Sequence, residues 1–176
     1  MSDDKNTLPL LLVTEAIREL EKRFEGMNDK TNHIETHICN LGKKPGFVMT
    51  SQILRNGSDI EGLEEICKFI ATRFSQSVFS VQAKPSLSQS KIFTLTFVER
   101  SPSWFQCLIP PNSSATPQQM FWFRAYGHFV MGVFCGALLH FGYKATPSFE
   151  KNSPLTLSFK LEELEGTWEF ASNVQH

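Results

Sequence analysis

The chain has 176 residues, which is enough for one sizeable hydrophobic core. Its 17 basic and 18 acidic residues leave a net charge of −1, so the bulk attraction that draws basic proteins to nucleic acid or anionic membranes is excluded. Hydrophobic residues make up 41% and charged residues 20%, as in ordinary soluble globular proteins. Sixteen phenylalanines against two tyrosines predict an aromatic core, or an aromatic surface reserved for a partner.

The first predicted helix covers about residues 8–27, where apolar residues recur at intervals of three and four. Thr7 can cap its start, and Pro9 is tolerated in an early position. The apolar stripe consists of Leu10, Val13, Ile17, Leu20, Phe24 and Met27. It is only one side wide, so it must lie against the chain's own core or against another subunit.

A second helical segment is predicted at about residues 31–54, with Ile34, Ile38 and Leu41 on one face. The run LGKKPG at 41–46 should kink or break this helix, because proline removes a hydrogen bond and clashes with the preceding turn. His33 and His37 have the spacing of two zinc ligands on one helix face. No third or fourth ligand follows at a motif spacing, which favours a polar helix face over a metal site.

A third helix is expected after the turn at 56–59 and continues to about residue 81. Ser58 and Glu61 have the spacing of a capping box. Its apolar stripe is Leu63, Ile66, Cys67, Ile70, Phe74 and Val78. Residues 83–89 are predicted to be a loop from their composition.

From residue 91 the apolar period changes to two, which predicts a strand at 91–98. Residues 104–109 are interpreted as the returning strand of a hairpin, followed by an exposed loop at 110–119. A second pair of strands is expected at 144–149 and 155–161, the latter with alternating leucine and phenylalanine.

The longest apolar run lies at 129–143. Thr116, Pro117 and Gln119 form a good helix start, so one helix is predicted from 117 to 141. Glycine costs about 1 kcal/mol against alanine within a helix, so Gly132 and Gly136 predict that another backbone packs closely there. The thirteen uncharged residues at 129–141 are too few for a membrane span, which needs about 20, so a buried core helix is favoured.

The first turns of this helix contain Phe121, Trp122 and Phe123. These are too many large side chains for one buried stripe, so they are a candidate docking surface for a partner. The alternative is that the preceding loop folds back over them.

The element order α-α-α-β-β-α-β-β predicts an α+β fold, with a helical layer packed on a four-stranded antiparallel sheet. One domain is expected at 8–161, between a disordered N-terminus at 1–7 and a partly ordered acidic and aromatic tail at 162–176. No nucleophile elbow, phosphate-binding loop or zinc-hydrolase motif occurs. We therefore expect no catalytic residue, metal or cofactor, and a function in binding or assembly. The polar start and the absence of a CxxC pair predict a reducing cytoplasm.

Several stretches match the packing motifs of a known family. They are FVMGVFCGALLHFGYKA at 129–145, PLTLSF at 154–159, FTLTFVER at 93–100 and LGxxxG at 41–46. With the element order, they resemble the small subunits of the transport protein particle (TRAPP), the Bet-three-like family. The resemblance covers about residues 8–161 and implies the Bet-three-like fold.

The resemblance implies a non-catalytic scaffold in a multisubunit vesicle-tethering complex of ER-to-Golgi transport, which activates a Rab GTPase when assembled. The implied partner is a paralogous subunit in a heterodimer, with a homodimer possible in isolation. The implied location is the cytoplasm, peripheral to early Golgi and ER membranes, with indirect membrane association. Family members pair through their first two helices, which here implies an interface at Leu10, Val13, Ile17, Leu20, Phe24, Ile34, Ile38 and Leu41.

Two features depart from the family pattern: Pro45 lies inside the LGxxxG helix, and the loop at 110–123 is longer than usual. The acylated subfamily carries a cysteine between its second and third helices. Residues 55–59 contain none, so the chain resembles the non-acylated partner subunit more closely. The alternatives are a divergent paralogue in another complex, or a sensor whose hydrophobic or lipid ligand contacts Phe134, Cys135, Leu138 and Phe141.

Overall fold

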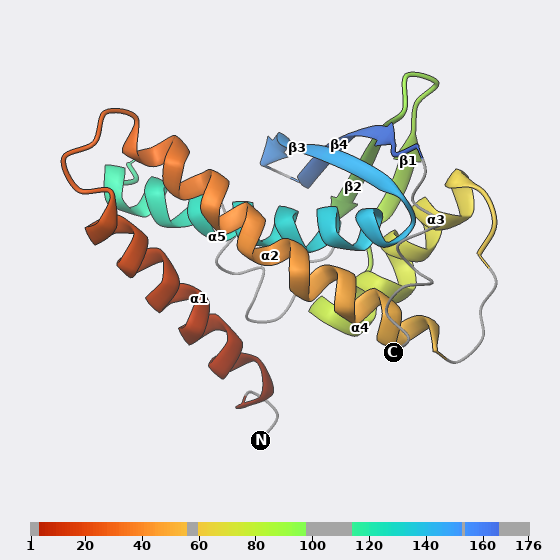
Figure 1. Cartoon of the computed structure of the whole chain (residues 1–176), viewed down its shortest axis with the longest axis horizontal. Coiled ribbons are helices and arrows are strands. Elements are labelled where there is room, and N and C mark those ends of the chain that lie inside the picture. The colour runs from red at the N-terminus through yellow and green to blue at the C-terminus, as the bar shows by residue number, and fades with distance from the viewer. Residues whose placement is uncertain (1–3, 56–59, 98–113, 153, 166–176) are drawn as a thin grey trace.

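The computed structural model describes residues 4–55, 60–97, 114–152 and 154–165. Its helices are α1 (Asp4–Arg23), α2 (Lys30–Leu54), α3 (Leu63–Phe69), the π-helical turn η1 (Ile70–Phe74), α4 (Ser75–Phe79) and α5 (Pro117–His140). Its strands are β1 (Lys84–Leu87), β2 (Ile92–Phe97), β3 (Tyr143–Asn152) and β4 (Leu155–Glu163). Figure 1 shows α2 and α5 running side by side through the molecule, with the strands at one end.

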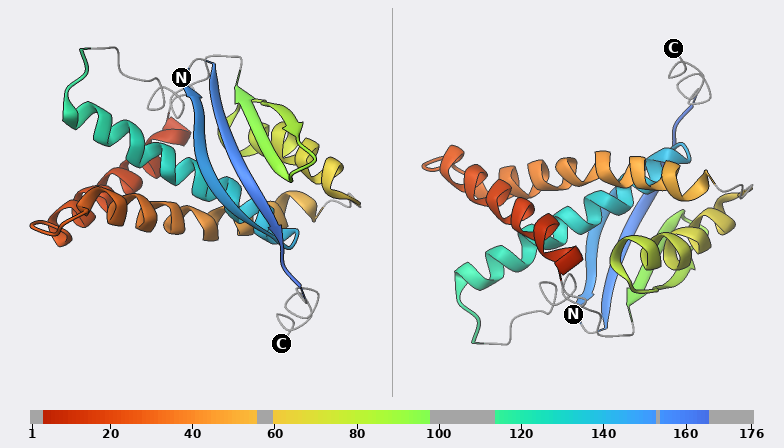
Figure 2. Two further views of the ribbon diagram at one scale, coloured as in Figure 1. Left: turned by 90° about the horizontal axis from the view of Figure 1, so that it is seen from above. Right: turned by 90° about the horizontal axis from the view of Figure 1, so that it is seen from below.

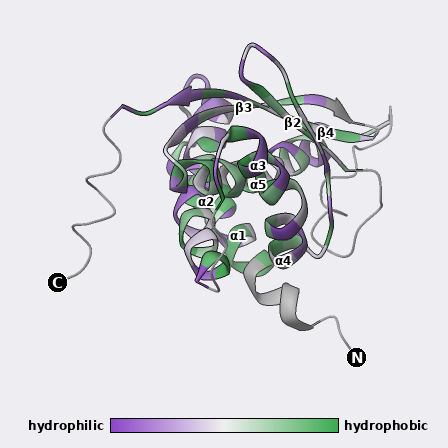
Figure 3. Ribbon diagram, turned by 90° about the vertical axis from the view of Figure 1, so that its right-hand side faces the viewer, coloured by the Kyte–Doolittle hydropathy of each residue, from purple (hydrophilic) through white to green (hydrophobic). Residues whose placement is uncertain are grey.

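The four strands form one antiparallel sheet in the order β1-β2-β4-β3. The helices cover one face of this sheet, as the two views of Figure 2 show. In Figure 3 the sheet crosses above the helices, and none of the described helices lies on its other face. The predicted α+β class, with helices on a four-stranded antiparallel sheet, is therefore confirmed.

The buried face of the sheet follows the period of two seen in the sequence. On β2 the buried residues are Phe93, Leu95 and Phe97, and the threonines between them are half-buried. Phe134 of α5 packs behind this face and has no exposed surface. Its ring centroid lies 5.3–6.1 Å from those of four other rings, which belong to Phe74, Phe79, Phe97 and Phe159. The many phenylalanines thus form an aromatic core between sheet and helices.

Helices α2 and α5 approach each other through four glycines. A Cβ atom on Gly132 would overlap the carbonyl oxygen of Cys39, and one on Gly136 would overlap that of Lys43. In return, Gly42 and Gly46 of α2 face carbonyl oxygens of α5. A neighbouring backbone therefore does lie against Gly132 and Gly136, and it belongs to α2.

Of the kink or break predicted at 43–45, the break does not occur, because α2 runs without interruption from Lys30 to Leu54 with Pro45 inside it. Proline still removes one helical hydrogen bond. The loss is offset because Gly42 and Gly46, on either side of Pro45, hold this part of α2 against α5. Packing outweighs the local preference of one residue here.

The prediction of a loop at 83–89 is also wrong, since β1 occupies Lys84–Leu87 and pairs with β2. The turn between them closes with a hydrogen bond from Lys91 N to Ser88 O of 3.1 Å. Proline is tolerated in β1 because this is an edge strand. The hairpin partner of β2 therefore precedes it in sequence, and the expected strand at 104–109 lies outside the described residues.

The ends of several elements also differ from expectation. Helix α1 begins at Asp4, so Thr7 lies inside the helix and is not its cap. Strand β4 extends to Glu163, into the predicted tail. The start of α5 is as predicted, because Thr116 and Gln119 form a reciprocal capping box. Within the described part of the chain, no helix is both long and apolar enough to cross a membrane.

Candidate partner-binding site

An open apolar groove of about 900 Å³ lies where α1, α2, α4 and α5 meet. It is lined by Leu12, Val13, Asn40, Leu41, Lys44, Pro45, Val48, Met49, Val78, Phe79, Phe129 and Val133. Only two of these side chains, those of Asn40 and Lys44, are polar. The groove therefore offers an almost entirely apolar surface to whatever enters it.

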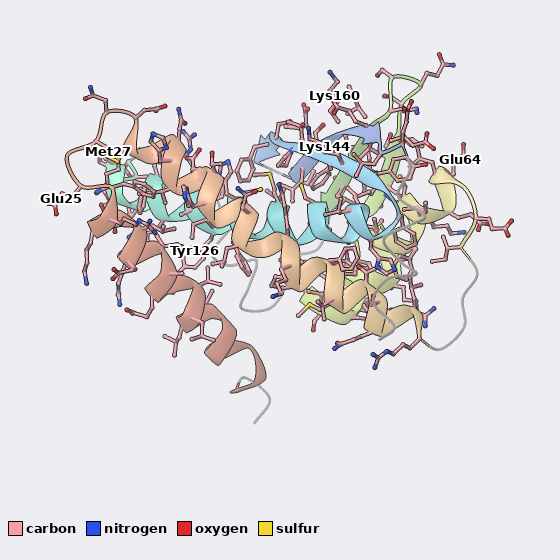
Figure 4. The ribbon with its side chains drawn as sticks, in the orientation of Figure 1. Glu25, Met27, Glu64, Tyr126, Lys144 and Lys160 are labelled. Carbon is pink, nitrogen blue, oxygen red and sulfur yellow. The ribbon has the colours of Figure 1, made fainter. Side chains whose placement is uncertain are left out.

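The groove exists because α1 diverges from α2 towards its N-terminus (Figure 1). Next to the turn that joins these helices, Phe24 packs against His33 and His37, with ring centroids 5.6 and 5.0 Å apart. Further along, the hydroxyl groups of Thr14 and Tyr126 form a 2.5 Å hydrogen bond that ties α1 to α5. Tyr126 is labelled in Figure 4. The first turns of α1, at its N-terminal end, lean away from α2.

The rim of the groove carries large apolar side chains that face solvent. Leu12 of α1 is 64% exposed. On α2, Leu41 is 49%, Val48 43% and Met49 39% exposed. Scattered exposed leucines are common on protein surfaces, but a contiguous apolar groove is typical of a protein–protein or ligand site.

Most of the predicted interface residues lie inside the chain's own core. Val13, Ile17, Phe24, Ile34 and Ile38 are buried, while Leu10 and Leu20 are half-buried against them. The cover that the stripe on α1 requires is thus supplied by α2 and α5. Of the predicted set, Leu41 is the one exposed residue, and Leu10 and Leu20 offer only part of their side chains to a partner.

The exposed residues Leu12, Val48 and Met49 were missed by the sequence interpretation. They lie beside the apolar stripes and not on them, so the helical period alone assigns them to solvent. The available signal was the width of the apolar surface: Leu11 and Leu12 extend the stripe of α1, and residues 47–49 extend that of α2.

The aromatic residues proposed for docking are partly incorporated into the fold. Phe123 is buried and stacks on Phe149, with ring centroids 5.6 Å apart. Phe121 and Trp122 are half-buried, and Trp122 packs against Tyr126 at 5.8 Å. A partner can therefore contact Phe121 and Trp122 but not Phe123. Docking at these two residues stays a prediction.

The residues named for an alternative ligand pocket are also packed. Phe134, Cys135 and Leu138 are buried, and Phe141 packs edge-on against Phe69 at 5.8 Å. None of the four lines the apolar groove. Among the residues that the structure describes, no group of three histidine, cysteine or acidic side chains could hold a metal ion. His33 and His37 instead flank Phe24.

An ion pair with a buried carboxylate joins α2 to α5. Glu35 is 6% exposed, and its Oε1 and Oε2 lie 2.6 and 3.0 Å from Nε and Nη2 of Arg124. The contact at Oε1 does not have hydrogen-bond geometry. Nε2 of His128 lies 3.5 Å from Oε2. Water barely reaches the Glu35 carboxylate, so the guanidinium group of Arg124 supplies most of the opposite charge that stabilises it in its buried position.

We expect the Arg124→Ala variant to lose about 1–3 kcal/mol of unfolding free energy, because the Glu35 carboxylate stays buried without its partner. This loss is smaller than for a fully buried pair because the Arg124 side chain is 48% exposed. Urea unfolding measures it. The matched control is Arg18→Ala, which removes an exposed pair with Glu15 and should change stability by less than about 0.5 kcal/mol. Equal losses of stability in the two variants would show that the Arg124–Glu35 pair stabilises the fold no more than the exposed Arg18–Glu15 pair does.

Comparison with known proteins gives two findings. The model of the transport protein particle (TRAPP) component family matches residues 10–167. Among solved structures, the chain is similar to a trafficking protein particle complex subunit 3 from Naegleria fowleri, which is covalently bound to palmitic acid. The TM-score is 0.63 with 16% sequence identity, over 88% of this chain and 95% of that one. At this identity the likeness concerns the fold alone. None of the curated proteins compared with the chain matches it.

Proposed function

The chain belongs to the transport protein particle (TRAPP) component family, and we propose that it is a non-catalytic scaffold subunit of a multisubunit vesicle-tethering complex. The complex would act in ER-to-Golgi transport and activate a Rab GTPase when assembled. The observation that carries the proposal is the exposed apolar groove between α1 and α2 in a chain of this family. A scaffold needs a permanent contact surface, and a groove rimmed by Leu12, Leu41 and Val48 supplies one.

The proposed partner is a paralogous subunit, which would fill the groove with apolar side chains of its own. This moves the contact from the buried stripe to the exposed rim of the same two helices. Residues that are already buried, such as Ile17 and Ile38, would support the rim from below without touching the partner. In this arrangement the subunit is cytoplasmic and meets early Golgi and ER membranes only through the complex.

We further propose that the subunit belongs to the non-acylated type. Residues 55–62, which connect α2 to α3, contain no cysteine. The nearest cysteine along the chain is Cys67, which is 2% exposed within α3. Burial raises the pKa of the Cys67 thiol to about 12, so its nucleophilic thiolate form is scarce at neutral pH.

Co-purification of the tagged protein from its own cells tests the proposal. We expect other transport-particle subunits to be recovered with the wild type, and recovery to fall at least tenfold with Leu12→Glu. A charge at this position would be buried unpaired on the partner's apolar surface. Val13 is unsuitable for this test because it is 5% exposed, and a charge there would unfold the domain.

Met27→Glu is the matched control, since it makes the same kind of change at a 49% exposed position on the turn between α1 and α2 (Figure 4). It should leave recovery unchanged, and both variants should keep the wild-type melting temperature. Failure to recover any transport-particle subunit with the wild type would refute the proposed complex. Full recovery with Leu12→Glu would instead show that the groove is not the interface.

A further inference from the structure

Two free cysteines meet at the crossing of α2 and α5. Cys39 is 8% exposed and Cys135 2% exposed, and neither is in a disulfide. Their thiols are hydrogen-bonded to each other. The Cys135 sulfur also lies 3.6 Å from the carbonyl oxygen of Ala145, so its S–H has two acceptors.

The close approach of the two thiols follows from the glycine packing. The Cys39 carbonyl lies directly against Gly132, which is one helical turn before Cys135. Gly42 lies one turn after Cys39 and faces the backbone of α5 in the same way. Because both backbones are held in contact here, the two side chains are held together by the fold and not by their own interaction.

The two thiols have opposite electrostatic environments. The hydrogen bond from Cys135 lowers the pKa of Cys39, with a further contribution from the charge of Lys43, against the opposing effect of burial. The same hydrogen bond, together with burial, raises the pKa of Cys135. Of the two thiols, Cys39 is therefore the one that loses its proton more readily.

Only one of the two thiols borders an opening to solvent. A second cleft of about 360 Å³ lies between α2, α5 and β3, and Cys39 is among the residues that line it. Cys135 is not among them. Most of the residues that line the cleft are polar, among them Asn40, Lys43 and Lys144. A small polar oxidant can thus reach Cys39 while Cys135 stays behind it.

We propose that Cys39 and Cys135 form a peroxide-reactive thiol pair, in which a small hydroperoxide oxidises Cys39 from the second cleft and Cys135 completes an intrachain disulfide. The Cys39 thiolate attacks the peroxide and breaks its O–O bond, which gives a sulfenic acid and releases water or an alcohol. Cys135 then attacks the Cys39 sulfur and passes its own proton to the departing hydroxyl group, so that an S–S bond forms and a second water leaves. The two thiols lose two electrons and two protons, and the hydroperoxide accepts them. An external thiol reductant reverses the reaction.

Such a bond would link α2 to α5, the two long helices that carry most of the apolar groove. The site does not depend on the proposed tethering function, because neither Cys39 nor Cys135 lines the apolar groove. It does not require an enzyme activity of the chain either. The product is a modified form of this protein.

The test is oxidation of the folded, full-length chain with hydrogen peroxide, followed by alkylation and peptide mass spectrometry. We expect a Cys39–Cys135 disulfide that dithiothreitol reverses, formed at least tenfold faster than any oxidation of Cys67. Cys67 is an internal control, because it is equally buried but has no thiol partner among the described residues. In urea the preference for this pair should be lost.

A second variant separates the two steps. In Cys135→Ala, Cys39 should accumulate as a sulfenic acid that dimedone traps, and no disulfide to Cys39 should form. Oxidation of Cys39 no faster than that of Cys67, or a disulfide from Cys39 to any other cysteine in the folded wild type, would overturn the proposal. If the variant does not fold, the peptide map of the oxidised wild type alone still separates these outcomes.

Discussion

Replacing Phe134 by alanine is expected to lower the free energy of unfolding by about 3–5 kcal/mol, as for other fully buried aromatic residues. The Phe134 side chain has no exposed surface and packs against four other rings, so its removal leaves a large cavity. These rings come from η1, α4, β2 and β4, and they cannot all move inwards without disturbing the sheet. Chemical denaturation of both proteins measures the difference.

Phe47→Ala is the matched control, because Phe47 is also on a long helix but is 41% exposed. Its loss should cost less than about 1 kcal/mol, since little apolar area returns to water. If both variants lose similar stability, the aromatic cluster around Phe134 is not the centre of the core. If Phe134→Ala binds small apolar molecules, the cavity has formed without collapse.

Gly46→Ala and Gly132→Ala should each destabilise the domain by about 1–3 kcal/mol or more, because the added methyl group meets a backbone carbonyl that cannot rotate away. The sign of the stability change distinguishes a close backbone contact from an open helix surface. In an open helix the same change stabilises by about 1 kcal/mol, since alanine is the better helix former. Urea unfolding with a constant m-value would show that the effect is on the native state.

The two glycine substitutions should also be non-additive. Each one forces α2 and α5 apart, so the second should cost less than the first in the double variant. Asn40→Ala provides the control, because Asn40 is exposed on the same helix and alanine there should be neutral or slightly stabilising. A stabilising effect of Gly46→Ala would refute the close helix contact.

Much of the fold could be predicted from local patterns. The capping residues Thr116 and Gln119 placed the start of α5, and the alternation of Phe93, Leu95 and Phe97 placed β2 with its buried face. The loop prediction at 83–89 failed because an edge strand of four residues has no apolar alternation of its own. Its partner strand β2 decided its conformation. The break expected at Pro45 failed for a similar reason, since contacts with α5 outweigh a lost hydrogen bond.

The candidate site was less predictable than the fold. An apolar stripe such as Ile17, Ile34 and Ile38 has the same pattern whether its cover is the chain itself or a partner. The difference depends on the angle between α1 and α2, which no local pattern encodes. The same angle exposes Leu12 and Val48 on the rim of the groove. The predicted residues therefore lie mostly on the inner faces of α1 and α2, whereas the exposed rim of the groove is formed by other residues of the same two helices.

Periodicity, capping and short motifs were sufficient for the class of fold, the close packing at Gly132 and Gly136 and the resemblance to the TRAPP family, because each of these is encoded within a few neighbouring residues. The contact of Gly132 with Cys39, the contact of Cys39 with Cys135 and the open groove between α1 and α2 became visible only in three dimensions. The cause is separation along the chain. Residues 39 and 135 have no local signal in common, and their contact exists only because two helices pack backbone against backbone.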